Sequence, residues 1–163
     1  MEKSSKRIGH KIFTCIAGEH FVAAEISKYG AIATITLKNV PNIDILASSV
    51  DGKQMASIQV KTGRLRTGGF IVGRDSMKIL GKNFFYVFVL LKDVTEPEYW
   101  IIPQSVVAKT AGSDYKTWIK GRPAKSRNAP ITFKWKYLNS KSFQKYHNNW
   151  DILGLKNSKK LVK

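Results

Sequence analysis

The chain has 163 residues, of which 43% are hydrophobic and 11% aromatic, a composition that excludes a disordered chain and suits one globular domain. Its 28 Lys and Arg residues outnumber 11 Asp and Glu residues, which gives a formal net charge of +17. Such a charge predicts a polyanionic partner, with nucleic acid ahead of an acidic membrane. Residues 116–163 hold thirteen of the basic residues and only one acidic residue, so we expect a basic binding face there. The alternative is a solvated surface that serves solubility alone.

A single cysteine, Cys15, excludes an intramolecular disulfide and a zinc site built from several cysteines. It stands among apolar residues, so we expect a buried thiol. The longest apolar run, residues 84–91, is far shorter than the ~20 residues of a membrane helix, and the first residues lack the apolar segment of a signal peptide. These features predict a cytoplasmic protein with no membrane partner.

The first predicted element is a helix over residues 12–29, preceded by a frayed basic segment, residues 1–11. Glu19 lies at the margin of its apolar stripe, whereas Glu25 lies on the opposite side and is expected to pair with Lys28 or Lys11 rather than take part in catalysis. The stripe itself consists of Val22, Ile26 and Tyr29.

Alternating or continuous apolar patterns then predict strands over residues 31–37, 43–48, 55–61, 84–91, 99–102 and 131–137. Turn residues at 50–53 join the second and third strands as a hairpin. Short helices are expected from Pro103 to Lys109 and over residues 140–147, and residues 150–155 are expected to pack on the core. The order of helix, three strands, loop or helix, and strand predicts an α/β fold with a mixed sheet flanked by helices.

Three polar residues occupy positions where a buried strand favours apolar ones. Asp44 separates Ile43 from Ile45, and Gln59 and Lys61 share one face of the next strand because side chains alternate along a strand. The hairpin brings Asp44 beside Gln59 and Lys61, while Glu19 approaches from the first helix.

Pro41-Asn42-Ile43-Asp44, followed after fourteen residues by Gln59-Val60-Lys61 and preceded by Gly18-Glu19 on a helix, resembles the PD-(D/E)XK nuclease superfamily, especially small resolvase-like and restriction-endonuclease-like proteins. The resemblance covers about residues 17–110 of a single domain over residues 12–153, and it leaves residues 154–163 as a basic tail. It implies a restriction-endonuclease-like α-β-β-β-α-β core. It also implies hydrolysis of DNA phosphodiester bonds, including those of junctions or other structured DNA, with Mg²⁺ or Mn²⁺ as cofactor. Resolvase-like members often form dimers, so the resemblance implies a homodimer as one assembly.

The resemblance implies Asp44, Gln59 and Glu19 as metal ligands and Lys61 as the catalytic lysine. Members usually carry Glu or Asp where this chain has Gln59, so the substitution removes one negative charge. Mg²⁺ binds through one or two protein carboxylates together with water and phosphate, and Asp44 and Glu19 satisfy that need. Two functions therefore stay open: a nuclease, and a nucleic-acid-binding protein that keeps the fold without the chemistry. An α/β protein unrelated to nucleases is the third alternative.

Seven cationic side chains are candidates for phosphate contacts, although each also suits plain solvated surface. One group follows the strand of Gln59 and Lys61, and the other lies on a loop between residues 120 and 130. They are Arg64, Arg66, Arg74, Lys120, Arg122, Lys125 and Arg127. The four tryptophans are expected to anchor the core, with stacking on a base as the alternative role.

Overall fold

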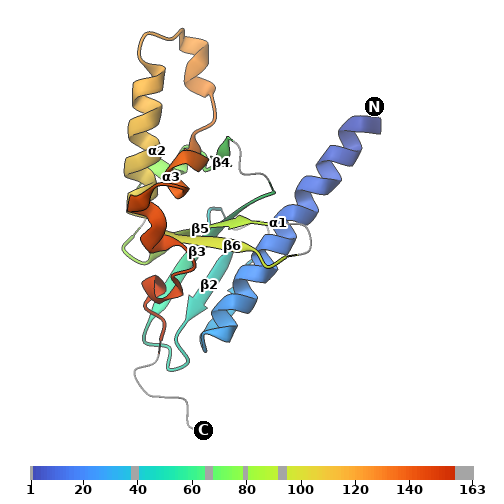
Figure 1. Cartoon of the computed structure of the whole chain (residues 1–163), viewed down its shortest axis with the longest axis vertical. Coiled ribbons are helices and arrows are strands. Elements are labelled where there is room, and N and C mark those ends of the chain that lie inside the picture. The colour runs from blue at the N-terminus through green and yellow to red at the C-terminus, as the bar shows by residue number, and fades with distance from the viewer. Residues whose placement is uncertain (1, 38–40, 65–67, 79–80, 92–94, 157–163) are drawn as a thin grey trace.

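A mixed sheet with the strand order β1-β2-β3-β5-β6 lies at the centre of the molecule (Figure 1). β2 is antiparallel to β1 and β3, β3 and β5 are parallel, and β6 is antiparallel to β5. A separate two-stranded sheet pairs β4 with β7. The computed structural model describes the backbone of residues 2–37, 41–64, 68–78, 81–91 and 95–156, and their side chains from Lys11 onward except Ala124 and Arg127.

The helices and strands are α1 (Glu2–Lys28), β1 (Ile32–Ile35), β2 (Ile45–Ser48), β3 (Met55–Gly63), β4 (Gly69–Ile71), η1 (Asp75–Met77), β5 (Phe84–Leu90), β6 (Glu98–Pro103), α2 (Gln104–Ile119), η2 (Ala124–Asn128), β7 (Thr132–Lys134), α3 (Trp135–Leu138), η3 (Lys141–Tyr146) and η4 (Trp150–Leu153), where η marks a 3₁₀-helix. The α/β class and the mixed sheet flanked by helices are therefore confirmed.

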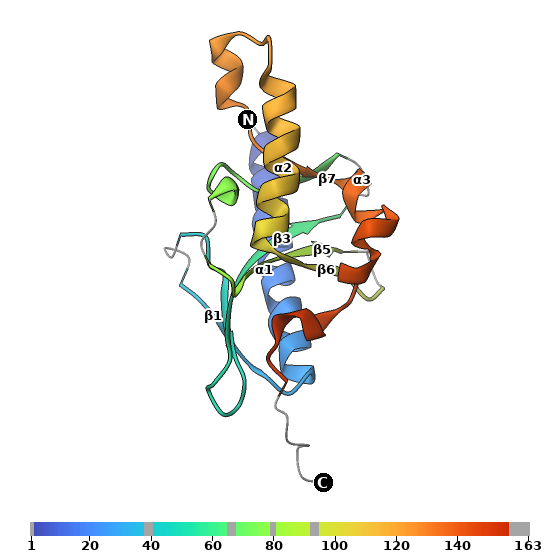
Figure 2. The ribbon, with the colours of Figure 1, turned by 90° about the vertical axis from the view of Figure 1, so that its left-hand side faces the viewer.

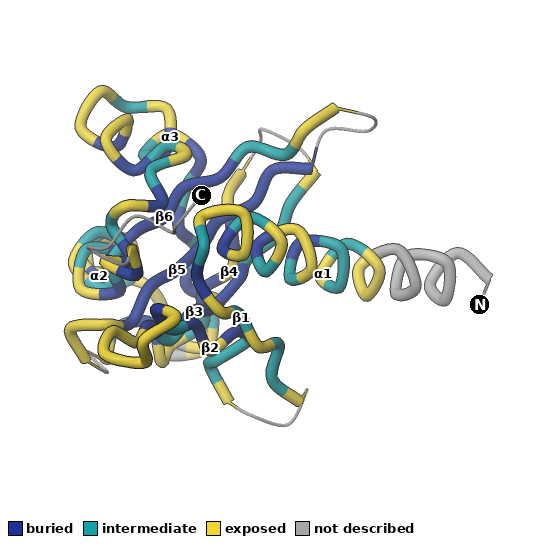
Figure 3. The backbone as a smooth tube through the Cα atoms, turned by 90° about the horizontal axis from the view of Figure 1, so that it is seen from below, coloured by how far each residue is buried: buried dark blue, intermediate teal, exposed yellow. Residues whose placement is uncertain are grey.

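Each face of the sheet has its own apolar core, because helices cover both faces (Figures 2 and 3). On one face, α1 and the C-terminal residues pack on alternate side chains of β2, β3, β5 and β6. On the other face, α2, α3, η3 and the β4–β7 pair cover the remaining side chains. All seven residues of β5 are buried, as its continuous apolar sequence predicts.

One expected element boundary and one expected burial at the N-terminal end of the fold are wrong. α1 begins at Glu2, so residues 2–11 continue the helix and are not a frayed segment. Lys, Glu and Ser tolerate helical backbone, and the helix gains one hydrogen bond for each residue added once it is nucleated. Cys15 is exposed on α1 and not buried, because the helix buries only the stripe that holds Val22 and Ile26.

The expected helix between the third and fourth strands is replaced by β4 and η1, and the described residues of that connection contain no α-helix. Four glycines between residues 64 and 83 disfavour a helix there. The α-β-β-β-α-β order is therefore wrong for this chain at its fifth element. The long second helix, α2, follows β6 instead, and it extends ten residues beyond the expected end at Lys109.

The region after α2 also differs from the predicted strand over residues 131–137. β7 holds three residues, and the chain turns into α3 at Trp135, because its partner β4 is equally short. The expected helix over residues 140–147 is the 3₁₀-helix η3. Trp150, Leu153 and Leu155 are buried, which confirms that the C-terminal residues pack on the core.

In the described part of the chain, no helix combines the length and the apolar composition that crossing a membrane requires.

Candidate functional site

Asp44 lies immediately before β2, held by backbone contacts to the strands on both sides. Its N–H donates to the carbonyl of Ile58 at 2.9 Å, and its carbonyl accepts from the N–H of Thr36 at 2.9 Å. The carboxylate accepts a further hydrogen bond from the N–H of Val60 at 2.7 Å. This last bond fixes the acid between Gln59 and Lys61, since Val60 is the residue that separates them.

A pocket of about 280 Å³ joins Asp44 to α1. Glu19, which is half-buried, lines it from the helix, and Asp44 lines it from the sheet. Cys15 and Thr36 also line it, whereas Gln59 and Lys61 are not among its described lining residues. Two of the four predicted site residues therefore face one pocket.

Gln59 and Lys61 lie on β3 with their side chains on the face away from α1, because Ile58 and Val60 belong to the core beneath α1. The Gln59 side chain is 8% exposed, and its Oε1 accepts no hydrogen bond from the described residues. A buried amide oxygen without a donor is costly, at about 1–3 kcal/mol, unless a ligand satisfies it. Gln59 therefore offers an unused oxygen on the face of β3 away from α1, outside the pocket that Asp44 and Glu19 line.

The electrostatics tie Asp44 to Lys61. Burial raises the pKa of Asp44 above its ordinary value, while the hydrogen bond from Val60 and the positive charge of Lys61 oppose that shift. The negative charge of Asp44 also affects Tyr86 of β5, the residue that pairs with Gln59 of β3. Burial raises the pKa of Tyr86 to about 12, and the carboxylates of Asp75 and Asp44 add to the effect. Asp44 thus lies within reach of both the α1 pocket and the Lys61 side chain.

The raised pKa of Asp44 predicts that Asp44→Asn stabilises the protein at neutral pH. The folded chain binds the Asp44 proton more tightly than the unfolded chain, so stability falls as pH rises through the folded pKa of this group. The neutral amide avoids that cost and still accepts from Val60. We expect the melting temperature at pH 7, in EDTA, to rise on the order of a few degrees. The gain disappears below the ordinary pKa of aspartate.

Asp51→Asn is the matched control because its pKa shift has the opposite sign. Ser49 donates to the Asp51 carboxylate at 2.6 Å, and this bond and the N–H of Lys53 lower the pKa of Asp51. Asp51→Asn is therefore expected to lower the melting temperature at pH 7 and to change nothing at low pH. Equal shifts for the two variants at pH 7 would contradict the assignment of the Asp44 environment.

The donor set at this site suits a small divalent cation. Asp44 and Glu19 supply carboxylate oxygens to the pocket that they share. Gln59 and Lys61 do not line that pocket, so the structure does not bring all four predicted site residues together in it. Among the described residues, no three His, Cys, Asp or Glu side chains gather closely enough to hold a metal ion. Mg²⁺ needs only one or two protein carboxylates, with water and substrate phosphate as the other ligands, so the two acids at this pocket fit its chemistry.

The first group of predicted phosphate contacts divides between two places. Arg64 is exposed, and its Nε donates to Thr14 of α1 at 3.2 Å. Arg74 is exposed just before η1, and its Nη2 donates to the hydroxyl of Tyr115 at 3.5 Å. Arg66 lies outside the described residues. Arg64 therefore accompanies α1 and Arg74 accompanies α2.

The second group lies beyond the sheet at the far end of α2 (Figures 1 and 2). Lys120, Arg122 and Lys125 are exposed there, and the side chain of Arg127 lies outside the described residues. The guanidinium carbon of Arg122 lies 4.3 Å from the centroid of the Trp118 ring, and the Arg122 Nε donates to the Trp118 carbonyl at 3.0 Å. Of the four tryptophans, Trp100, Trp135 and Trp150 are buried core residues as expected, whereas Trp118 is 38% exposed.

The sequence analysis missed Tyr115, and it expected Trp118 in the core, with stacking on a base as the alternative role. Both follow helical spacing within α2, with ring centroids 6.1 Å apart, and Arg122 stands one turn after Trp118. A helix predicted to continue past Lys109 would have placed Tyr115 and Trp118 on one face.

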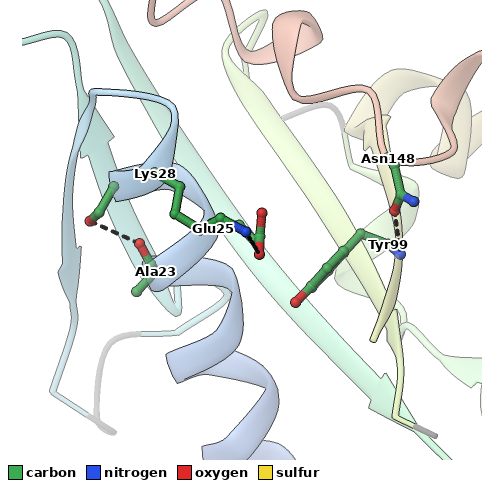
Figure 4. A network of polar contacts seen from close by, with 6 residues as sticks. Ala23, Glu25, Lys28, Tyr99 and Asn148 are labelled. Atoms are coloured by element: carbon green, nitrogen blue, oxygen red, sulfur yellow. Dashed lines mark hydrogen bonds and ion pairs between the residues drawn. The ribbon is translucent and has the colours of Figure 1, made fainter. Parts of the chain in front are cut away.

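Glu25 pairs with Lys28 at 2.8 Å, as the sequence predicts (Figure 4). This ion pair raises the pKa of Lys28, and Tyr99 lies nearby on β6, its N–H donating to Asn148 at 3.0 Å. Glu25 is thus at the opposite margin of the α1 stripe from Glu19.

Comparisons with models of protein families, with curated proteins and with solved structures found no match to this chain.

Proposed function

We propose that this chain is a divalent-metal-dependent endonuclease with a restriction-endonuclease-like fold, acting on DNA. The observation that carries the proposal is the position of Asp44. Its carboxylate lines a pocket with Glu19, is fixed by the N–H of Val60 and is close enough to Lys61 for its pKa to respond. The sheet order with a parallel β3–β5 pair and antiparallel β2 and β6 is compatible with that fold.

In this proposal Asp44 and Glu19 hold the cation at the pocket that they share, and Gln59 is the further ligand that the family resemblance implies. A bound divalent cation supplies neutralisation of phosphate charge and lowers the pKa of water. Lys61, half-buried beside Asp44, orients the attacking water or stabilises the charge that develops on the phosphate.

The test is a cleavage assay with the full chain on branched, duplex and single-stranded DNA and on RNA, in Mg²⁺, Mn²⁺ or EDTA. We expect cleavage of DNA that requires the metal and leaves a 5′-phosphate. Absence of turnover on every substrate with both metals would overturn the proposal.

A second function, nucleic-acid binding without turnover, is favoured by one observation: Gln59 is neutral where a third acid would hold the cation more tightly. This protein would use the same basic surface. Binding through six phosphate contacts gives a slope of roughly −5 in a plot of log affinity against log salt, from about 0.9 per neutralised phosphate. A steep slope in Ca²⁺ together with no cleavage would identify this second function, and a slope near zero would assign the charge of +17 to solubility.

A further inference from the structure

A second pocket, of about 170 Å³, lies between the C-terminal half of α2 and β7. Its walls combine aromatic and charged side chains. Asp114, Tyr115 and Trp118 come from α2, and Lys134 comes from β7. The ammonium of Lys134 lies 2.6 Å from the carboxylate of Asp114. This volume is below the range typical of drug-sized ligands, so the pocket suits one planar ring system.

The pocket belongs to a protruding arm, which we define as residues 109–128. Both views show the end of α2 rising past the sheet before the chain returns through η2 to β7 (Figures 1 and 2). Six Lys and Arg residues and one acid lie in the arm. Its exposed cations are Lys109, Lys116, Lys120, Arg122 and Lys125.

Trp118 is the only tryptophan with substantial exposure among the described residues, and it is ordered by Arg122 rather than by burial. An exposed indole beside a cluster of cations is the combination that binds single-stranded nucleic acid, since bases stack on the ring while cations hold the phosphates. Asp114 and Lys134, which form an ion pair with each other, place one acidic and one basic group in the wall of the same pocket.

The arm is connected to the candidate site through the segment that holds η1. Arg74 contacts Tyr115, with its guanidinium 6.0 Å from the ring centroid. The neighbouring Asp75 is hydrogen-bonded to the side chain of Asn42, two residues before Asp44. Arg74 and Asp75 therefore link the arm to the segment that precedes Asp44.

We propose that the pocket between α2 and β7 binds one unpaired base of a nucleic-acid strand, stacked on Trp118, while the arm cations hold the adjoining phosphates. This inference deepens the proposed function and rests on it for the fate of the strand: the substrate class becomes nucleic acid with at least one unpaired base near the cleaved bond.

The test measures fluorescence anisotropy of the full chain with a labelled twelve-nucleotide single strand, in EDTA so that cleavage plays no part. The comparison probe has the same backbone with abasic residues in place of every nucleotide. We expect wild type to bind the base-bearing strand about tenfold more tightly. Trp118→Ala should remove that preference and leave affinity for the abasic strand unchanged. DNA and RNA versions are compared, and the preference supports the proposal on whichever backbone it occurs.

Two further variants keep the result interpretable. Tyr29→Ala removes a ring of similar exposure, 42%, at the other end of the molecule and should retain the full preference. Ala129→Leu fills the pocket without removing the indole, and this variant should lose the preference for the base-bearing strand. Equal binding of both probes by wild type, retention of the preference in Trp118→Ala, or an equal loss on both probes would each overturn the inference. Because no turnover is measured, these outcomes are separate from failure of the nuclease proposal.

Discussion

Asp44→Asn is expected to lower metal-dependent cleavage by at least about a hundredfold, because even residues that only support a metal ligand cost 10–100-fold when removed. Nucleic-acid affinity in Ca²⁺ should stay constant or rise, since the change removes a negative charge that faces phosphate. The measurement is single-turnover cleavage in Mg²⁺ beside anisotropy in Ca²⁺. Asp51→Asn, on the exposed hairpin turn, serves as the control and should cut like wild type.

The pH dependence and the Gln59→Glu variant sharpen that prediction. Metal binding requires an ionised carboxylate, so the raised pKa of Asp44 means that metal affinity declines with falling pH earlier than for an ordinary aspartate. Gln59→Glu restores a carboxylate beside the cation and should raise Mg²⁺ affinity. Cleavage by Asp44→Asn at the wild-type rate would show that the site lies elsewhere.

Gly18→Ala is expected to destabilise the fold although alanine is the better helix former. A Cβ on Gly18 would overlap Thr62 Oγ1 and lie 2.9 Å from both Thr62 Cβ and Cγ2. Overpacking of this kind costs about 1–3 kcal/mol, against a gain of about 0.8–1.0 kcal/mol in helix propensity. We expect the melting temperature to fall, and cleavage to fall with it, because α1 must move and it carries Glu19.

Gly112→Ala provides the matched substitution in the other long helix. There the new Cβ would meet Met77 at 3.7 and 3.8 Å, which is ordinary contact, so the propensity gain remains and the melting temperature should rise. Thr62→Ala alone should cost little, because Thr62 Oγ1 makes no hydrogen bond with the described residues. The double variant Gly18→Ala/Thr62→Ala should recover part of the loss. A stabilising Gly18→Ala would show that α1 does not contact β3 this closely.

Much of the sheet and of the site could be predicted because the signals are local. The continuous apolar run of β5, the turn at Gly52 and the two-residue alternation around Gln59 each determine a strand, a turn or a face without reference to the rest of the chain. Glu19 and Asp44 meet at one pocket because the hydrophobic stripe of α1 fixes which side of the helix faces the sheet.

The failures arise where a contact distant in sequence decides the structure. The helix expected from Pro103 ended at Lys109, yet α2 continues through Gly112, which lies buried in the helix close to Met77 of η1. Phe133, Trp135 and Tyr137 alternate like a strand, but Trp135 and Leu138 are both buried at helical spacing in α3. The arm pocket depends on the same error, since Tyr115 and Trp118 acquire their common face only when α2 passes Gly112.

The burial of β5 on both faces also has a consequence for the unfolded chain. Its seven residues are uncharged, rich in aromatic and β-branched side chains, and contain neither proline nor glycine, which is the composition of segments that stack into cross-β aggregates. In the native sheet this segment pairs with β3 in parallel, and parallel pairing across a long connection forms slowly. During refolding this aggregation-prone segment therefore stays exposed until the slow parallel pairing with β3 has formed. Recovery of native protein after denaturation should decrease as protein concentration rises, and the strong positive charge of the rest of the chain is the force that opposes this self-association.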